Sequence, residues 1–284
     1  MNGIDHRECI VPISTTPWWL WPNLLSLDAP LVALLWHLAF ARAFGLSVEP
    51  TALALLVLAV WLVYVVDRLL DIRGVTDVTK ATARHQFYAR HARGSWSAVG
   101  LGSVLGALGV LRWASWALIG FGVMMSVVVV GYLLCVHRRW RWLRKEMACG
   151  VIFSLGTSLS LLVATNKMLD GWFSLAVVMF AALCAANCLT IARIETGEDA
   201  THDPMAVTRQ SPGWVRCLPS FLVLGGVSSI TLWASSGLWL FAAMAVGWAG
   251  LWLIGGREDE QRNWRRVAAD GCLLAPLLWL MLMA

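Results

Sequence analysis

The chain of 284 residues alternates between long apolar segments and short polar loops rich in Lys and Arg. Most of its length falls in apolar runs of about 18 residues or more, which is long enough for a helix to cross a bilayer. The alternating ten-residue segments of a membrane barrel are not seen in the pattern. Because only helices and closed barrels satisfy the backbone in lipid, the pattern predicts an all-α membrane protein.

The apolar runs predict a bundle of nine transmembrane helices. We expect residues 1–284 to form a single integral-membrane domain, in which 1–27 are a polar and then aromatic lead-in. Two longer polar loops, 73–94 and 195–212, lie four spans apart, a spacing that suggests helices facing one another across a central cavity that opens to these loops. The predicted spans are 28–45, 50–72, 95–112, 114–136, 145–165, 171–194, 214–234, 237–255 and 265–283.

Basic residues are distributed unevenly between the two ends of these spans. Of the 22 Lys and Arg residues, eighteen lie in or beside the loops after the second, fourth, sixth and eighth spans. The intervening loops hold only Arg42, Arg112 and Lys167. Loops rich in Lys and Arg stay in the cytoplasm. We therefore expect a cytoplasmic N-terminus, an outer C-terminus and a location in the inner membrane of a bacterium.

Composition agrees with this interpretation and narrows the possible partners. Hydrophobic residues make up 59% of the chain and charged residues 14%, whereas a soluble domain carries about 25% charged residues. The net charge of +5 comes from the short loops, so we expect no nucleic-acid partner. The seven cysteines have no zinc or redox spacing, and we interpret them as small buried residues.

Two carboxylates four residues apart end the second predicted span. The segment from Thr51 to Val66 carries no formal charge, and Asp67 and Asp71 follow it. On a helix these two side chains share one face and can hold a cation between them. A carboxylate at the centre of a membrane helix costs about 2.5–3.5 kcal/mol, so such a pair usually faces a functional cavity. The alternative is a helix end whose acidic face is simply solvated.

A second acidic cluster ends the sixth predicted span. Glu195 and Asp199 repeat the four-residue spacing, and Asn187 precedes them on the same span. The two clusters together would offer the oxygen ligands that Mg²⁺ prefers and commonly shares with substrate phosphates. Cationic side chains beside both clusters can hold phosphate oxygens or, alternatively, only orient the chain toward lipid headgroups. These candidates are Arg68, Lys80, Arg84, Lys145 and Arg193.

These motifs resemble those of a known family. Residues 67–71, with the sequence DRLLD, resemble the first aspartate-rich motif of the UbiA superfamily of intramembrane prenyltransferases. Residues 195–199, with the sequence ETGED, are similar to its second motif, and residues 80–84 to the basic stretch that follows the first. Residues 144–146 resemble the basic start of its fifth helix. The resemblance covers most of the chain in order and spacing.

The resemblance implies a magnesium-dependent enzyme that acts on a prenyl diphosphate. Two Mg²⁺ ions and the basic residues would hold the diphosphate, with Tyr64 beside the first acidic pair as a hydrogen-bond donor. Departure of the diphosphate would leave an allylic carbocation in an apolar chamber. Aromatic rings such as Trp36 and Trp61 could stabilise that charge. The metal ligands that the resemblance implies are Asp67, Asp71, Asn187, Glu195 and Asp199.

Several functions remain open from the sequence. The main expectation is transfer of the prenyl group to a lipophilic and, we expect, aromatic acceptor. A terpene cyclase of the same fold would need no separate acceptor. Val63 stands where the family usually has Asn or Asp, which leaves open a non-catalytic protein that binds or moves isoprenoid lipids. The pattern shows no pair of Gly- or Pro-broken helices of the kind that transporters use, which disfavours an unrelated transporter.

Overall fold

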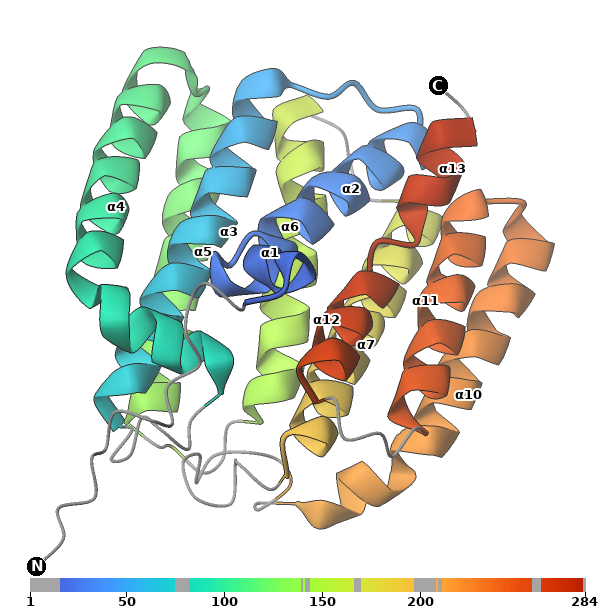
Figure 1. Cartoon of the computed structure of the whole chain (residues 1–284). Helices are drawn as coiled ribbons and strands as arrows, with labels where there is room; N and C mark the ends of the chain where they lie inside the picture. The colour runs from blue at the N-terminus through green and yellow to red at the C-terminus, as the bar shows by residue number, and fades with distance from the viewer. Residues whose placement is uncertain are drawn as a thin grey trace, which may run out of the picture.

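All regular elements in the described part of the chain are helices (Figure 1). The computed structural model describes residues 16–74, 82–138, 140, 144–165, 170–196, 208, 211–256 and 262–282. The helices are α1 (Trp21–Leu24), α2 (Asp28–Ala43), α3 (Pro50–Asp71), α4 (Ala83–Trp113), α5 (Trp116–His137), α6 (Lys145–Thr165), α7 (Gly171–Ile194), α10 (Pro212–Ser236), α11 (Trp239–Gly255), α12 (Arg262–Cys272) and α13 (Pro276–Leu282). Single 3-10 turns, η2 (Trp18–Leu20) and η3 (Ile72–Gly74), precede α1 and follow α3.

Six of these helices are long and apolar enough to cross a membrane, namely α3, α4, α5, α6, α7 and α10. A bent pair, Trp18–Leu24 with Asp28–Ala43, adds a seventh if it is counted as one span. α11 is apolar but only 17 residues long. The chain therefore has the helices of an all-α integral membrane protein, as the sequence predicts. The count of nine spans stays a prediction.

Two of the predicted elements differ from the structure. α4 begins at Ala83, inside the predicted loop 73–94, and runs to Trp113 with a kink at His91. The predicted span 265–283 is interrupted, because α12 ends at Cys272 and α13 begins at Pro276. Proline cannot donate a backbone hydrogen bond, so it starts a helix well but rarely continues one.

A second interruption lies near the beginning of the chain. The segments on either side of Leu25–Leu27 are bent by 81° relative to each other. Ser26, within the break, has a φ of 53°, which is uncommon for a residue other than glycine. Its Oγ lies 2.9 Å from the hydroxyl of Tyr88 on α4, and this contact fixes the turn. The predicted span 28–45 begins directly after this break, whereas the bend itself and the interruption of the predicted span 265–283 before Pro276 were not predicted.

Several helices begin at a side chain that caps their first backbone N–H groups. Glu49 accepts hydrogen bonds from the backbone of Thr51 and Ala52 at the start of α3. Thr82, Ser115 and Asp170 cap α4, α5 and α7 in the same way. Such caps satisfy donors that have no partner inside the helix, so the helix starts are fixed locally.

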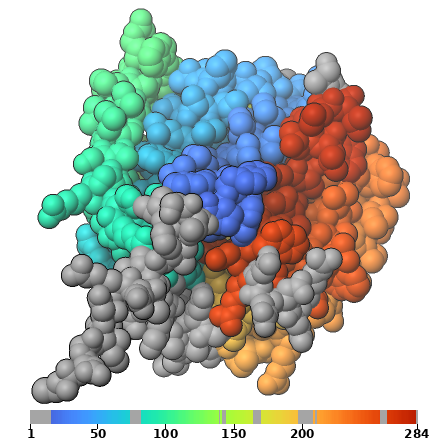
Figure 2. Space-filling model, in the orientation of Figure 1, coloured from blue at the N-terminus to red at the C-terminus, as the bar shows by residue number. Residues whose placement is uncertain are grey.

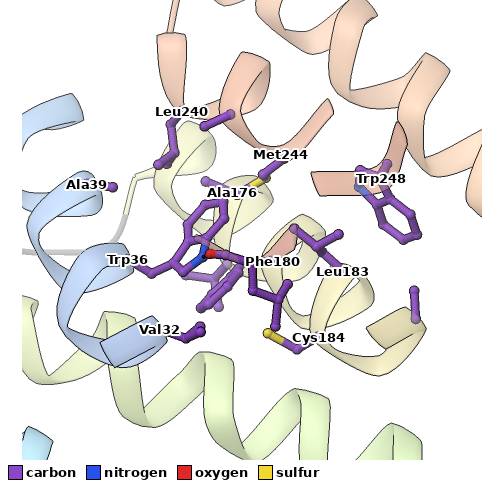
Figure 3. Packing of buried hydrophobic residues seen from close by; sticks show 14 of the residues in the cluster. Val32, Trp36, Ala39, Ala176, Phe180, Leu183, Cys184, Leu240, Met244 and Trp248 are labelled. Carbon is purple, nitrogen blue, oxygen red and sulfur yellow. Dashed lines mark hydrogen bonds between the residues drawn. The ribbon is translucent and has the colours of Figure 1, made fainter. Parts of the chain in front are cut away.

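The largest apolar core joins α2, α6, α7 and α11 (Figure 3). Trp36 of α2 is fully buried and stacks on Phe180 of α7 with ring centroids 4.3 Å apart. Its indole Nε1 donates to the carbonyl of Leu273, at a distance of 2.7 Å, in the turn between α12 and α13. A buried indole needs such a partner. The core therefore ties the interrupted C-terminal segment to the first long helix, and these segments lie against each other in Figure 2.

α6 and α7 approach each other closely at Gly150. A Cβ atom at this position would lie 2.6 Å from the backbone nitrogen of Ala185 and 2.8 Å from the carbonyl oxygen of Ala181. Only glycine allows this backbone approach. The crossing sets the spacing of the two helices that carry Lys145 and Asn187.

Candidate functional site

A cavity of about 570 Å³ lies among α2, α3, α4, α5, α6, α7 and α12. The cavity lies between helices, as predicted for a central cavity, and its opening toward the cytoplasm stays a prediction. Its wall combines apolar side chains, among them Val32, Leu133 and Phe153, with many polar ones. The charged or titratable residues in the wall include Asp28, Asp67, Arg68, Asp71, Arg73, Arg84, His85, His137, Lys145, Glu146, Glu195, Arg266 and Asp270.

The first acidic pair lies in this wall, as expected if it is functional. Asp67, Asp71 and His137 each offer one ligand atom, and these atoms all lie within 4.8 Å of one another. Arg68 on the same helix lies between the two carboxylates, with Nη1 3.5 Å from Asp67 Oδ2 and 3.4 Å from Asp71 Oδ2. The pair and its arginine therefore form one compact group on the last turn of α3.

Two histidines on other helices flank Asp71. His137 Nε2 is 3.6 Å from Oδ1 and His85 Nε2 is 3.8 Å from Oδ2. The opposite ring nitrogen of His137 lies 2.9 Å from the carbonyl oxygen of Leu133, which only a protonated Nδ1 can satisfy. Its Nε2 is buried and has no hydrogen-bond partner among the described residues. In the neutral ring this atom presents a lone pair beside the carboxylates.

This donor set suits a divalent cation. Carboxylate oxygens are the ligands that Mg²⁺ prefers, and an imidazole nitrogen adds affinity for transition metals such as Mn²⁺. The hydrogen bond from His137 Nδ1 to a backbone carbonyl is the usual outer contact that orients a metal-binding histidine. His137 Nε2 makes no hydrogen bond among the described residues and lies 3.6 Å from Asp71 Oδ1, an arrangement that a metal ion between the two atoms, or a proton on the ring, would satisfy.

The described part of the second acidic cluster lies in a different setting. Glu195 is buried between two arginines, with Oε2 3.3 Å from Arg84 Nη2 and Oε1 2.9 Å from Arg266 Nη1. Both of its oxygens are thus engaged by cations from α4 and α12. Asp199 lies outside the described residues, so its place as a ligand, like that of Glu195, stays a prediction.

The other predicted site residues divide into those in the cavity wall and those elsewhere. Asn187, Tyr64, Arg68, Arg84 and Lys145 line the cavity. Arg193 is exposed at the end of α7 and is not part of the wall. Lys80 lies outside the described residues.

The tryptophans that the sequence suggested for stabilising a positive charge are not in the wall, whereas the predicted Tyr64 is. Trp36 is buried in the apolar core, and Trp61 donates its indole N–H to the carbonyl of Leu25. The wall instead contains Tyr64, Tyr132 and Phe153. These rings would face a positive charge formed inside the cavity.

Sequence reasoning missed several residues of the wall. His85, His137 and Arg266 are single polar residues near helix ends, and nothing in their local spacing connects them to Asp71 or Glu195. Asp270 had one available signal, because it is the only carboxylate within the apolar stretch 265–283. Asp28 looked only like a helix start.

Comparisons with protein-family models, curated proteins and solved structures found no match to this chain.

Proposed function

We propose that this protein is a divalent-cation-dependent enzyme that ionises an isoprenoid diphosphate and transfers the prenyl group to a lipophilic, aromatic acceptor. The observation that carries the proposal is the group formed by Asp67, Asp71 and His137 in the wall of a partly apolar cavity. The motif resemblance to the UbiA superfamily supports the same chemistry. The proposal includes a bundle of nine spans with its N-terminus in the bacterial cytoplasm.

The residues of the wall suit the charges of such a reaction. When bound by Asp67, Asp71 and His137, Mg²⁺ or Mn²⁺ would neutralise charge on the diphosphate. Arg68, Arg84 and Lys145 also face the cavity and would bind the remaining phosphate oxygens. Arg84 is oriented by Glu195, which holds its guanidinium group in the wall.

The bond changes follow from this arrangement. The carbon–oxygen bond of the prenyl diphosphate breaks, and its electron pair leaves with the diphosphate oxygen. The allylic cation that remains would lie beside Tyr132 and Phe153, whose ring faces stabilise positive charge. An electron-rich carbon of the acceptor then forms the new bond and loses a proton. Basic side chains that are already in position before the reaction stabilise the negative charge that develops on the departing diphosphate. They lower the reaction barrier because they do not have to move during the reaction.

Two other functions are each supported by an observation. The cavity volume of about 570 Å³ lies within the usual range of ligand pockets, about 300–1,000 Å³, so it also fits a terpene cyclase, which needs one substrate only. The interrupted helices beside the cavity and Val63 in its wall favour a non-catalytic protein that binds or moves isoprenoid lipids.

Product analysis separates these functions. The purified protein is incubated with prenyl diphosphates of several chain lengths and Mg²⁺, with and without phenolic or quinone-type acceptors. A prenylated acceptor supports transfer. A cyclic hydrocarbon formed without an acceptor supports a cyclase and contradicts transfer. Binding of the diphosphate with no product under any condition contradicts both enzymes and supports the carrier.

A further inference from the structure

A second pair of carboxylates, separate from Asp67 and Asp71, also faces the cavity. Asp28 is the first residue of α2 and Asp270 lies on α12, near the two ends of the chain. The side-chain nitrogen of Asn23 lies 2.7 Å from Asp28 Oδ2 and 3.4 Å from Asp270 Oδ2. One amide group thus bridges both carboxylates, which places them side by side.

Asn187 completes this group from α7. Its Nδ2 donates to Asp270 Oδ1 at 3.0 Å. Its Oδ1 is buried and has no hydrogen-bond partner among the described residues, and the whole residue is only 5% exposed. A buried acceptor left without a partner destabilises the folded protein, so it usually has a partner. Because Asn187 lies in the cavity wall, this oxygen is available to a ligand in the cavity.

The break between α1 and α2, near the beginning of the chain, helps to bring these residues together. The 81° bend between α1 and α2 places Asn23 against Asp28, five residues later. The left-handed backbone of Ser26 and its contact with Tyr88 hold this bend. Backbone conformations of this kind are strained and persist where surrounding contacts hold them in place.

Neither carboxylate of the pair forms an ion pair with a described residue. The hydrogen bonds that the two carboxylates receive in the described residues come from neutral groups, the amides of Asn23 and Asn187 and the backbone N–H of Ala29. The two arginines of the same region, Arg84 and Arg266, are engaged by Glu195. Two adjacent carboxylates repel each other unless a proton or a cation lies between them.

We propose that Asp28, Asp270 and Asn187 form a second site for a hard divalent cation. The three side chains would supply carboxylate and amide oxygens, and water or diphosphate oxygens would complete the coordination, as is usual for Mg²⁺. The site shares no ligand with the Asp67–Asp71–His137 group. Binding of the cation does not depend on the proposed enzymatic function, and only its role in holding a diphosphate rests on that function.

The test counts bound metal without any prenyl substrate. The full-length protein in detergent is titrated with Mn²⁺ at moderate salt, and free Mn²⁺ is measured by electron paramagnetic resonance. We expect two ions in the wild type, one in Asp270→Asn, one in Asp71→Asn and none in the double variant. Asp170→Asn, which changes a helix-capping carboxylate outside the cavity, should still bind two. Circular dichroism verifies that each variant is folded.

The outcomes separate this inference from the proposed function. A single bound ion that Asp71→Asn removes and Asp270→Asn leaves in place overturns the second site, while pyrophosphate release can still be observed. Two ions in the wild type and one in Asp270→Asn support the second site even if no prenyl diphosphate reacts. If Asp270→Asn does not fold, Asn187→Ala replaces it and should weaken only the second ion, by about 10-fold or more. Unchanged binding of both ions in that variant overturns the inference.

Discussion

The Nε2 atom of His137 lies 3.6 Å from Oδ1 of Asp71, so the last residue of α5 faces the last residue of α3. The hydrogen bond from Nδ1 to Leu133 directs the other ring nitrogen, Nε2, toward the carboxylate. Asp71 and His137, which lie on two different helices, thus place their ligand atoms in one group with that of Asp67. Variants of this group therefore give the most direct tests of metal binding.

Asp67→Asn and Asp71→Asn should each lower metal-dependent turnover at least about 100-fold, the size of effect expected when a group that stabilises developing charge is removed. Each change keeps the shape of the side chain but removes an anionic ligand. Asp170→Asn is the matched control, because asparagine also caps a helix and Asp170 is outside the cavity. Release of pyrophosphate from a prenyl diphosphate is the measurement. Wild-type rates in both cavity variants would show that the pair is only a solvated helix end.

His137→Ala should weaken metal binding more than it lowers the maximal rate. Loss of one nitrogen ligand should raise the Mn²⁺ concentration for half-maximal activity by about 10–100-fold, and excess metal should restore turnover. His91→Ala is the control, because His91 also bonds a carbonyl of its own helix but is not in the cavity wall. Equal metal dependence in the two variants would contradict a role for His137 as a ligand.

Glu195→Gln should destabilise the protein in the absence of metal. Glu195 joins α7 to Arg84 of α4 and Arg266 of α12 in a buried network, and breaking such a pair costs about 3–5 kcal/mol. Thermal unfolding in detergent should therefore occur at a lower temperature than in the wild type. The exposed neighbour Arg193→Gln should leave the unfolding temperature unchanged. If Glu195→Gln lowers the unfolding temperature only when metal is added, the result would instead support the predicted role of Glu195 as a metal ligand.

Gly150→Ala should separate α6 from α7. The added methyl group would meet backbone atoms of Ala181 and Ala185, which cannot rotate away, so we expect a loss of about 1–3 kcal/mol of stability. Gly156→Ala on the same helix is the control, because its Cβ would only touch the flexible end of Met125 at 3.6 Å. Thermal unfolding compares the two variants. Equal stability would contradict the close crossing.

The helices could be placed from the sequence because apolar length is a local property. The predicted span 50–72 is found as Pro50–Asp71, and 171–194 as Gly171–Ile194. The bend before Asp28 could not be predicted in this way, because it depends on contacts between segments that are distant in the sequence, and the interruption of 265–283 was missed although Pro276 marks it. What bends the chain at Ser26 is a contact with Tyr88, more than 60 residues away.

The site residues likewise divide into those set by local spacing and those set by the packing of distant helices. The i, i+4 spacing of Asp67 and Asp71 is local, and the structure confirms that they share one group. The partners of Asp71 on α4 and α5, and those of Glu195 on α4 and α12, depend on how helices pack. No spacing in the sequence connects Asp28 to Asp270, which lie on the first long helix and near the end of the chain. The predicted ligand Asn187 lies in the wall, but beside Asp270 instead of Asp67.

Pyrophosphate release by the purified wild-type protein is the decisive test of the proposed enzymatic function. Prenyl diphosphates of several chain lengths are supplied with Mg²⁺ or Mn²⁺, with and without aromatic acceptors, and again after the metal is removed by a chelator. We expect release for at least one chain length, its loss with the chelator and its recovery when metal is restored. No release with any substrate, metal or acceptor, from protein that is folded and binds Mn²⁺, would contradict the proposed function.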